Sequence, residues 1–360
     1  MSGEERYETG LGYAFMKSGK DTRMLLRYQD AVVDQDINVG RLRPKGSYDN
    51  LIANRNHALK GLLNTDGEIS AKYLRERLCP SCRSNKYEFQ FVKDHLNIVS
   101  CQRCSLVYVN PILKPEICEN IYRSTEYADI VKKLGEESHD YRKERFGYER
   151  MVNIERYTPQ NLPKKLLEIG CSTGFMLEAA RERGWESVGV ELNPSAVRFG
   201  RERGINIIDR PLEEIDFGVK KFSAIAMYDV IEHLVDPAET LEKVRELLVN
   251  RGAVFIYVPN FQSASKELLG VENAHFIWPT HHLTYFTPTT LGDFLHRRGF
   301  EVVHWETQGL DIEDWLWYIK EKTDYDAALI EENKTFFQFV INASGYGKNL
   351  RMYARKINDA

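Results

Sequence analysis

The stretch Leu166-Leu167-Glu168-Ile169-Gly170-Cys171-Ser172-Thr173-Gly174 decides the fold, because it places a glycine-bearing turn between a short apolar run and an amphipathic segment. Turns of this kind follow the strands of doubly wound sheets, where ligands bind at the carboxyl ends of the strands. Glycine lets the backbone approach a ligand closely. The spacing Gly-x-x-x-Gly differs from the Gly-x-Gly-x-x-Gly that cradles a dinucleotide pyrophosphate, so the turn alone does not identify a ligand.

Short apolar runs alternate with amphipathic segments throughout the C-terminal half of the chain. We expect strands at residues 166–170, 187–191, 205–208, 222–228, 253–258 and 301–305. Strands that alternate with helices indicate an α/β fold, with a mostly parallel sheet covered on both faces. The second of these strands ends at Glu191, whose carboxylate could accept hydrogen bonds from both hydroxyls of a ribose.

Two helices are predicted from shorter patterns. Asp236 is a typical N-cap, Pro237 suits the first helical position, and the apolar residues that follow share one face, namely Leu241, Val244, Leu247 and Leu248. Residues 68–78 also look helical.

Two cysteine pairs, Cys79-Pro80-Ser81-Cys82 and Cys101-Gln102-Arg103-Cys104, are separated by eighteen residues. This spacing is typical of a four-cysteine zinc ribbon. Four thiolates complete a tetrahedron and leave no open position, so we expect a structural Zn²⁺ rather than a catalytic one. A redox dithiol and an unoccupied remnant of a metal site are the alternatives.

Composition bounds the class of protein. The chain has 360 residues, 42% of them hydrophobic, and a net charge of −4, which is typical of a soluble protein of about two domains. It contains no apolar run long enough for a transmembrane helix and no secretory signal. We therefore expect a cytoplasmic protein with reduced cysteines.

The order of motifs resembles that of class I S-adenosylmethionine (SAM)-dependent methyltransferases. The matching pieces are Glu168-x-Gly170-x-x-x-Gly174, Glu191, Asp229-Val230-Ile231-Glu232-His233, Asp236-Pro237, Arg251-Gly252, Val258-Pro259-Asn260, the block from His281 to Pro288, and Arg298-Gly299-Phe300. The resemblance covers about residues 76–360. The cysteine pairs look like those of bacterial methyltransferases that act on sugars and other small molecules.

This resemblance implies a Rossmann-like sheet of seven strands, the last of them antiparallel and formed by residues 349–356. We expect an N-terminal arm of unclear role at 1–75, a zinc ribbon at 76–110, a helical linker or lid at 111–160, and the SAM-binding domain at 161–360, with a helical insertion at 310–345. The arm could pack on another domain, build a homodimer contact, or be a decoration without function.

The resemblance also implies the residues that contact SAM. They are Glu168, Gly170, Cys171, Ser172, Gly174, Glu191, Leu192, Leu212, Glu213 and Asp229. Gly170 and Gly174 would line the methionine part, Glu191 would hold the ribose, and Glu213 or Leu212 would lie near the adenine. Asp229 would face the sulfonium side. Ser172 stands where the family usually has glycine, and a positive φ there would cost about 1 kcal/mol. We interpret Cys171 as core-facing rather than nucleophilic.

Methyl transfer to oxygen or carbon requires removal of a proton, for which histidine is well suited. His233 follows the fourth strand and is the first candidate for the general base; a helix-start histidine that bonds the backbone is the alternative. His281 and His282 come second, in a stretch whose aromatic residues could line the acceptor pocket, namely Phe276, Trp278, Tyr285 and Phe286. Asp229, Glu232 and His233 could together hold Mg²⁺ or Mn²⁺.

We therefore expect a SAM-dependent methyltransferase that acts on a small molecule, such as a sugar or a nucleotide- or lipid-linked precursor, by O- or C-methylation. One alternative is an RNA or protein methyltransferase that grips its substrate with the zinc ribbon, which carries Arg83, Lys86, Lys93 and Arg103. The nearly balanced charge of the N-terminal part disfavours nucleic acid. The other alternative is a non-catalytic SAM-fold scaffold, against which the intact Glu191 and Asp229–His233 segment count.

Overall fold

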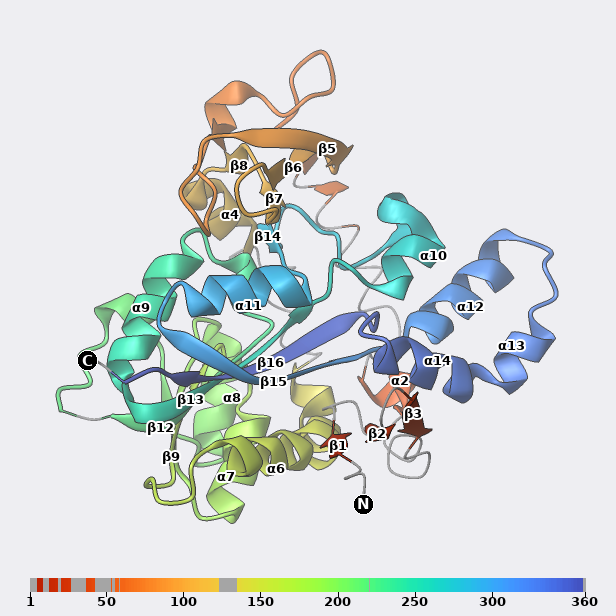
Figure 1. Cartoon of the computed structure of the whole chain (residues 1–360). Helices are drawn as coiled ribbons and strands as arrows, with labels where there is room; N and C mark the ends of the chain where they lie inside the picture. The colour runs from red at the N-terminus through yellow and green to blue at the C-terminus, as the bar shows by residue number, and fades with distance from the viewer. Residues whose placement is uncertain are drawn as a thin grey trace.

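A seven-stranded sheet forms the centre of the C-terminal part of the chain in the computed structural model (Figure 1). The structure describes residues 5–8, 13–18, 21–26, 37–42, 53, 56–57, 59–122, 135–219 and 221–358. The strand order is β11 (Ile207–Ile208), β10 (Glu186–Val190), β9 (Lys165–Ile169), β12 (Phe222–Tyr228), β13 (Leu248–Pro259), β16 (Asn349–Lys356) and β15 (Phe300–Gln308). Only β16 runs antiparallel to its neighbours, so the predicted Rossmann-like sheet is confirmed.

Helices cover both faces of this sheet because neighbouring strand residues point to opposite sides. On β9, Leu166 packs in one apolar cluster and Leu167 in another. The Leu166 side is covered by α6 (Tyr148–Tyr157), α7 (Phe175–Glu182) and α8 (Pro194–Glu202). The Leu167 side is covered by α9 (Pro237–Leu247) and α11 (Pro288–His296). Figure 1 shows the two groups of helices on either side of the strands.

Helix α9 begins as its sequence predicts. The Asp236 side chain accepts hydrogen bonds from the backbone N–H groups of Ala238 and Glu239, and Pro237 is the first helical residue. The predicted apolar face is buried. The helix ends at Leu247, and β13 begins at the next residue, Leu248.

The cysteine-containing region forms a sheet that it shares with the C-terminal part of the chain. Its order is β14 (Thr284–Tyr285), β7 (Val107–Val109), β6 (Leu96–Cys101) and β5 (Tyr87–Lys93). Thr284 pairs with Tyr108 across β14 and β7. The guanidinium group of Arg77 reinforces this junction by donating to the Leu283 carbonyl oxygen at 2.6 Å. The ribbon, at the top of Figure 1, is therefore built onto the segment that carries His281 and His282.

The helix predicted at residues 68–78 is wrong. One 3-10 turn, η1 (Ala71–Tyr73), is followed by β4 (Leu74–Arg75), which pairs antiparallel with β8 (Ile112–Leu113). The pairing gives the backbone of β4 hydrogen-bond partners that a short isolated helix would not have supplied, and tertiary pairing overrides the local pattern here.

The N-terminal arm is only partly within the described residues. Strands β1 (Glu5–Glu8), β2 (Tyr13–Ser18) and β3 (Asp21–Leu26) form an antiparallel meander, and α2 (Val39–Leu42) follows. Farther along, Leu59 and Ile69 are buried in the apolar cluster of the ribbon. The prediction that the arm packs on another subunit stays untested.

Three groups of helices complete the fold. Helix α4 (Pro115–Tyr122) follows β8, and residues 135–142 are helical and lead through the π-helix η2 (Lys143–Gly147) into α6. Helix α10 (Ala264–Asn273) follows β13. Helices α12 (Asp311–Lys322), α13 (Ala328–Glu332) and α14 (Lys334–Ala343) lie between β15 and β16.

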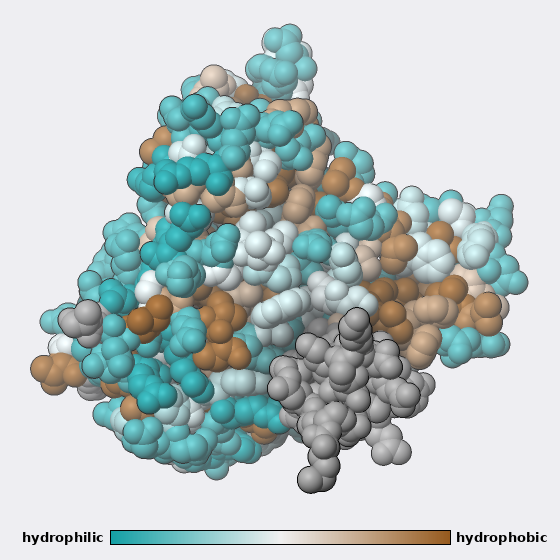
Figure 2. All heavy atoms as spheres, in the orientation of Figure 1, coloured by the Kyte–Doolittle hydropathy of each residue, from teal (hydrophilic) through white to brown (hydrophobic). Residues whose placement is uncertain are grey.

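The helices between β15 and β16 carry a buried anchor and an apolar surface. The Asp311 carboxylate accepts from the backbone and hydroxyl of Ser265 and from the Lys348 backbone N–H. Figure 2 shows apolar side chains gathered over this part of the surface, where the exposed residues include Trp317, Leu329, Phe336 and Val340. No helix within the described ranges is long and apolar enough to cross a membrane.

Candidate functional site

The glycine loop, residues 170–174, lies between β9 and α7 at the carboxyl edge of the sheet. Gly170, Ser172 and Gly174 all have positive φ, of 70°, 50° and 78°. A Cβ on Gly170 would lie 2.4 Å from Cγ2 of Val230, so this position admits only glycine without a shift of its neighbour. Ser172 therefore has the positive φ that was the condition for a conformational cost at this position. Serine incurs that cost because its Cβ disfavours the left-handed backbone conformation.

Glu191 ties the glycine loop to the next strand. One of its carboxylate oxygens accepts from the Ser172 N–H at 2.8 Å, and the other accepts from the N–H groups of Leu192 and Asn193, both at 2.8 Å. The loops that follow β9 and β10 therefore meet at one carboxylate. Leu192 is 61% exposed beside it, an apolar side chain left in water at the edge where ligands of such sheets bind.

Two other residues predicted to contact the cofactor turn their side chains into the core. Cys171 packs beneath Gly189, whose added Cβ would lie 2.4 Å from the Cys171 Sγ. Leu212, in the 3-10 turn η3 (Leu212–Glu214), is buried in the core on the α9 side of the sheet. Only the backbone of these residues is left to meet a ligand. Glu213 is exposed, and its carboxylate accepts from the Thr240 hydroxyl at 3.4 Å.

Two acidic side chains lie at the carboxyl ends of the central strands. Glu168 is buried in β9, and burial raises its pKa to about 8. Asp229 follows β12 with a φ of 54° and is open to solvent, yet burial among the surrounding atoms raises its pKa to about 6. Both carboxyl groups lie at the edge of the sheet where ligands of such folds bind.

Arg150 is a residue of this site that the sequence pattern did not reveal. It comes from α6, and its guanidinium carbon lies 4.0 Å from the centre of the Tyr228 ring. Its charge opposes the rise in pKa at both Glu168 and Asp229. Its Nε atom has no hydrogen-bond partner among the residues that the structure describes. In the sequence Arg150 stands within a charged helical run, where nothing distinguishes it from solvent-facing residues.

The helix at residues 135–142 contacts the glycine loop. The His139 ring lies between the Thr173 hydroxyl, at 2.8 Å from Nδ1, and the Glu178 carboxylate, at 2.9 Å from Nε2. Burial lowers the pKa of His139 against the opposing effect of Glu178. The segment predicted to be a linker or lid thus holds one side of the loop.

Two of the predicted catalytic histidines lie together. His233, in the 3-10 turn η4 (Ile231–His233), and His282 have ring centres 4.7 Å apart. His233 Nδ1 donates to the His281 carbonyl oxygen at 2.9 Å, and His282 Nδ1 donates to that of Phe276 at 2.6 Å. A carbonyl oxygen only accepts, so each Nδ1 carries the proton and each Nε2 keeps its lone pair.

Both imidazoles are neutral at neutral pH. Burial, together with the neighbouring His282 and His281, lowers the pKa of His233 well below its ordinary value. Burial also lowers the pKa of His282 to about 4. Neutral imidazole with a free Nε2 is the form that accepts a proton or binds a metal ion.

Glu232 lies against this pair. It is only 1% exposed, and neither carboxylate oxygen has a hydrogen-bond partner within the described part of the chain. Burial and the nearby Asp229 raise its pKa well above the ordinary value. One ligand atom from each of Glu232, His233 and His282 lies within 4.8 Å of the others.

The predicted cation group of Asp229, Glu232 and His233 is therefore rearranged. His282 joins Glu232 and His233, and Asp229 is not among the grouped ligand atoms. The reason is a backbone hydrogen bond of 2.8 Å from the Leu283 N–H to the Glu232 carbonyl oxygen, which brings residues 281–283 alongside η4. This contact joins parts of the chain that are distant in sequence.

The aromatic residues before and after His281 pack in the core. Phe276 and Tyr285 are buried in the apolar cluster of the ribbon, and Phe286 is buried in the cluster that packs under α9 and α11. His281 is also buried, with its Nδ1 at 2.8 Å from the Thr280 hydroxyl. The burial of these three rings is what packing in the core would produce, and the role of the aromatic residues in lining an acceptor pocket stays a prediction.

The four predicted zinc ligands converge. The sulfur atoms of Cys79 and Cys104 are 3.5 Å apart, as are those of Cys82 and Cys101, and all four lie within 4.8 Å of one another. Disulfide sulfurs would be about 2.05 Å apart, whereas thiolates about 2.3 Å from one central zinc ion are about 3.8 Å apart. The spacing suits a tetrahedral metal site.

The two cysteine knuckles have the same backbone geometry. In the first, the Arg83 N–H donates to the Cys79 carbonyl oxygen; in the second, the Ser105 N–H donates to that of Cys101, both at 2.9 Å. Arg83 and Ser105 both have positive φ. Each knuckle turns back on itself in the same way and aims its two sulfurs at the common centre.

Of the four basic residues that were predicted to grip a substrate, Lys93 is buried, whereas Arg83, Lys86 and Arg103 are exposed. Lys93 is buried and donates to the carbonyl oxygens of Val271 and Ala274 at 2.7 and 3.0 Å. Arg83 forms a 3.0 Å ion pair with Asp236. Because phosphate contacts need accessible cations, Lys93 is not available for a nucleic-acid grip, whereas the other three basic side chains remain accessible.

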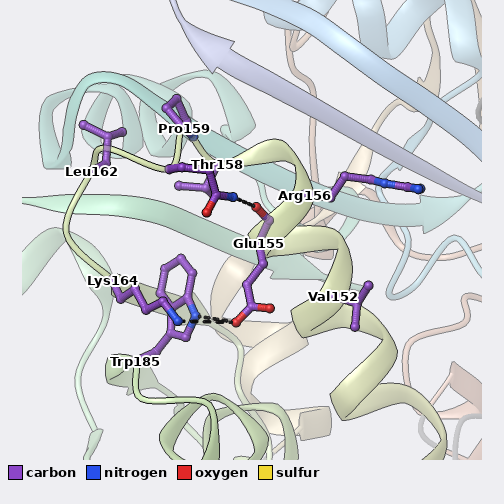
Figure 3. A pocket seen from close by; sticks show the side chains of 9 residues that line it. Val152, Glu155, Arg156, Thr158, Pro159, Leu162, Lys164 and Trp185 are labelled. Atoms are coloured by element: carbon purple, nitrogen blue, oxygen red, sulfur yellow. Dashed lines mark hydrogen bonds and ion pairs between the residues drawn. The ribbon is translucent and has the colours of Figure 1, made fainter.

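A surface pocket of about 310 Å³ lies at the opposite edge of the sheet (Figure 3). It is lined by Val152, Glu155, Arg156, Thr158, Pro159, Gln160, Leu162, Lys164 and Trp185. Glu155 accepts from Arg183 Nε and Trp185 Nε1, both at 3.2 Å. These residues surround the starts of β9 and β10, away from the glycine loop, and the charge of Glu155 is already paired.

Comparison with known proteins gives one family and several more distant likenesses. The sequence model of a family described as a methyltransferase domain matches residues 121–305. The ubiquinone biosynthesis O-methyltransferase of Saccharophagus degradans is 24% identical over 152 residues, which cover 39% of this chain and 64% of that protein. That of Pseudomonas aeruginosa is 26% identical over 152 residues, with 39% and 65% covered. The chain spans slightly less than two thirds of the length of these relatives.

Among solved structures, a SAM-dependent methyltransferase from Archaeoglobus fulgidus is 21% identical, with a TM-score of 0.43 and coverage of 64% of this chain and 100% of that one. The 1,6-didemethyltoxoflavin-N1-methyltransferase of Burkholderia thailandensis is 16% identical, with a TM-score of 0.45 and coverage of 75% and 100%.

Proposed function

Because the chain belongs to the methyltransferase domain family, we propose that it transfers a methyl group from SAM to a hydroxyl oxygen of a small molecule. The observation that carries the proposal is the Glu191 carboxylate, which meets the glycine loop and the turn after β10 at three backbone N–H groups. A carboxylate has about four acceptor positions. At least one is left at Glu191 for a ribose hydroxyl.

The residues at the carboxyl edge suit an adenosine-containing ligand. Gly170 and Gly174 present bare backbone at positive φ, and the exposed Leu192 offers an apolar surface for a flat ring. Arg150 supplies a positive charge for the carboxylate of the methionine part. When bound, SAM supplies a methyl group already activated on a sulfonium.

On the acceptor side, Asp229, His233 and His282 remain our candidates for catalytic groups. A hydroxyl must lose its proton before or during transfer, and both histidines keep Nε2 free to accept one. The relatives named O-methyltransferases favour oxygen as the acceptor. The zinc-ribbon resemblance favours a sugar or a nucleotide- or lipid-linked precursor.

The cysteine cluster is proposed to hold a structural Zn²⁺ through Cys79, Cys82, Cys101 and Cys104. The sulfur spacing leaves no position for a substrate. Since β7 of the ribbon pairs with β14 next to His282, the metal would act by fixing the backbone that positions the acceptor side of the site.

An RNA or protein methyltransferase is the second class of function. Burial removes Lys93 from contact with phosphates, which disfavours RNA as the substrate. Three polar side chains at the proposed acceptor side, Asp229, His233 and His282, disfavour a non-catalytic scaffold. Partly buried polar groups such as the two histidines cost stability without a ligand, and a scaffold would gain nothing in return.

Calorimetric titration with S-adenosylhomocysteine tests the proposal. We expect zinc-loaded protein to bind about one equivalent, and Glu191→Gln to bind at least tenfold more weakly. A neutral amide loses charge-assisted hydrogen bonds worth about 1.5–3 kcal/mol each, and tenfold in affinity is about 1.4 kcal/mol. Glu186→Gln, at the exposed far end of the same strand, should bind as the wild type does. Absence of binding by wild-type protein would overturn the proposal.

A further inference from the structure

We propose that Glu232, His233 and His282 form a binding site for a divalent transition-metal ion such as Mn²⁺, distinct from the residues proposed to bind SAM. Ion binding at this site stands on the geometry alone. Its role in methyl transfer rests on the proposed function above.

The first step is the orientation of the two imidazoles. Each Nδ1 is committed to a backbone carbonyl oxygen, His233 to that of residue 281 and His282 to that of residue 276. Metal-binding histidines characteristically donate their other ring N–H to a carbonyl or carboxylate, which fixes the tautomer and aims the free nitrogen. Both histidines make this Nδ1 hydrogen bond. Their Nε2 atoms lie close to each other and to the Glu232 carboxylate.

The second step is the carboxylate. Glu232 is almost completely buried, and neither oxygen has a hydrogen-bond partner among the residues described. Oε1 lies 3.8 Å from His233 Nε2, which is too long for a hydrogen bond. A buried carboxyl without a partner is costly. A cation between these atoms would satisfy the carboxylate and both nitrogens at once.

The third step is how the backbone builds the site. Glu232 and His233 come from η4, directly after strand β12, and His282 comes from the segment held to η4 by the hydrogen bond from the Leu283 N–H to the Glu232 carbonyl oxygen. This segment continues into β14, which pairs with the zinc ribbon. The three ligands are thus carried by backbone that is fixed on both sides.

The ligand set indicates which ion. Imidazole nitrogen favours first-row transition metals over Mg²⁺, and two histidines with one carboxylate bind such ions on one face while leaving positions open. His233 and His282 are partly accessible, so an open position can meet solvent or an acceptor. A cation there would lower the pKa of an acceptor hydroxyl, whose proton would pass to water. The imidazoles would then act as ligands and not as bases.

The test is a titration of zinc-loaded full-length protein with Mn²⁺, without SAM, followed by the electron paramagnetic resonance signal of free Mn²⁺. We expect about one Mn²⁺ bound per chain. Glu232→Gln and His282→Gln should each weaken binding at least tenfold. His296→Gln, an exposed histidine on α11, should leave it unchanged. Failure of the wild type to bind Mn²⁺, or equal binding by all four proteins, would overturn the proposal.

Two further measurements keep the outcome decisive. If a variant does not fold, Mn²⁺ should broaden the imidazole proton resonances of His233 and His282 in wild-type protein before those of His296, and the reverse order would overturn the site. Titration of the same samples with S-adenosylhomocysteine separates the two proposals. Mn²⁺ binding without nucleoside binding supports the metal site and rejects the methyltransferase proposal, and the opposite result rejects the metal site alone.

Discussion

Replacing Gly170 with alanine tests the packing of the glycine loop. The new Cβ would lie 2.4 Å from Cγ2 of Val230, in a residue with a φ of 70°. The left-handed conformation costs about 1–2 kcal/mol for a residue with a side chain, and forcing a methyl group into occupied space costs about 1–3 kcal/mol. We expect Gly170→Ala to lower the free energy of unfolding by about 2–5 kcal/mol.

Gly184→Ala is the matched control for this substitution. Gly184 has a φ of 77°, and a Cβ there would meet no atom within 4 Å, so the variant incurs only the dihedral cost of about 1–2 kcal/mol. Replacing glycine with alanine also lowers the conformational entropy of the unfolded chain, and this effect is the same for both variants. The difference between their unfolding free energies therefore measures the clash with Val230.

Urea unfolding of the two variants and of Gly170→Ala/Val230→Ala completes the test. Removal of the Val230 methyl groups should recover about 1–3 kcal/mol relative to the sum of the single changes, because the clash is a pairwise term. The reasoning is refuted if Gly170→Ala is no more destabilising than Gly184→Ala, or if the double-mutant cycle is additive.

Three further outcomes are expected. Burial raises the pKa of Glu168 from 4.5 to about 8, so between these pH values the folded chain holds a proton that the unfolded chain has released, and the stability of the fold falls as the pH rises. In calorimetric melting, Glu168→Gln should melt like the wild type near pH 4.5 and at a higher temperature than the wild type at about pH 8. A difference that does not change with pH would contradict this. A chelator should remove about one zinc ion per chain and lower the melting temperature. In metal analysis, Cys101→Ser should lack zinc, whereas Cys118→Ser, which lies outside the cluster, should retain it. Zinc retained by Cys101→Ser would count against the site. Ser172→Gly should raise the urea midpoint by an amount equivalent to about 1 kcal/mol, since it relieves a φ of 50°; a lower midpoint would show that the serine is not strained.

The parts of the fold that were predictable depend on local chemistry. Each buried parallel strand is a short apolar run, so β9 and β12 are visible as such. The start of α9 follows from Asp236 and Pro237, because a cap and a proline act on their own neighbours. The cysteine cluster was predictable because each knuckle is a local turn and the spacing of the two pairs is typical of a four-cysteine zinc ribbon.

The parts that were not predictable depend on pairing between distant segments. The pairing of Thr284 with Tyr108 joins the ribbon to the segment that carries His282, and no local pattern specifies it. The hydrogen bond from the Leu283 N–H to the Glu232 carbonyl oxygen places His282, rather than Asp229, beside Glu232. Arg150 became a site residue only because α6 packs its end against Tyr228. In β4, pairing with β8 replaced a helical pattern.

Hydrogen–deuterium exchange with and without S-adenosylhomocysteine is the most direct test of a nucleoside site shared by the glycine loop and Glu191. We predict that the ligand slows exchange at the amides of residues 170–174 and 191–193, while the ribbon residues 79–104 change little. Protection confined to other segments, or none at saturating ligand, would contradict the account.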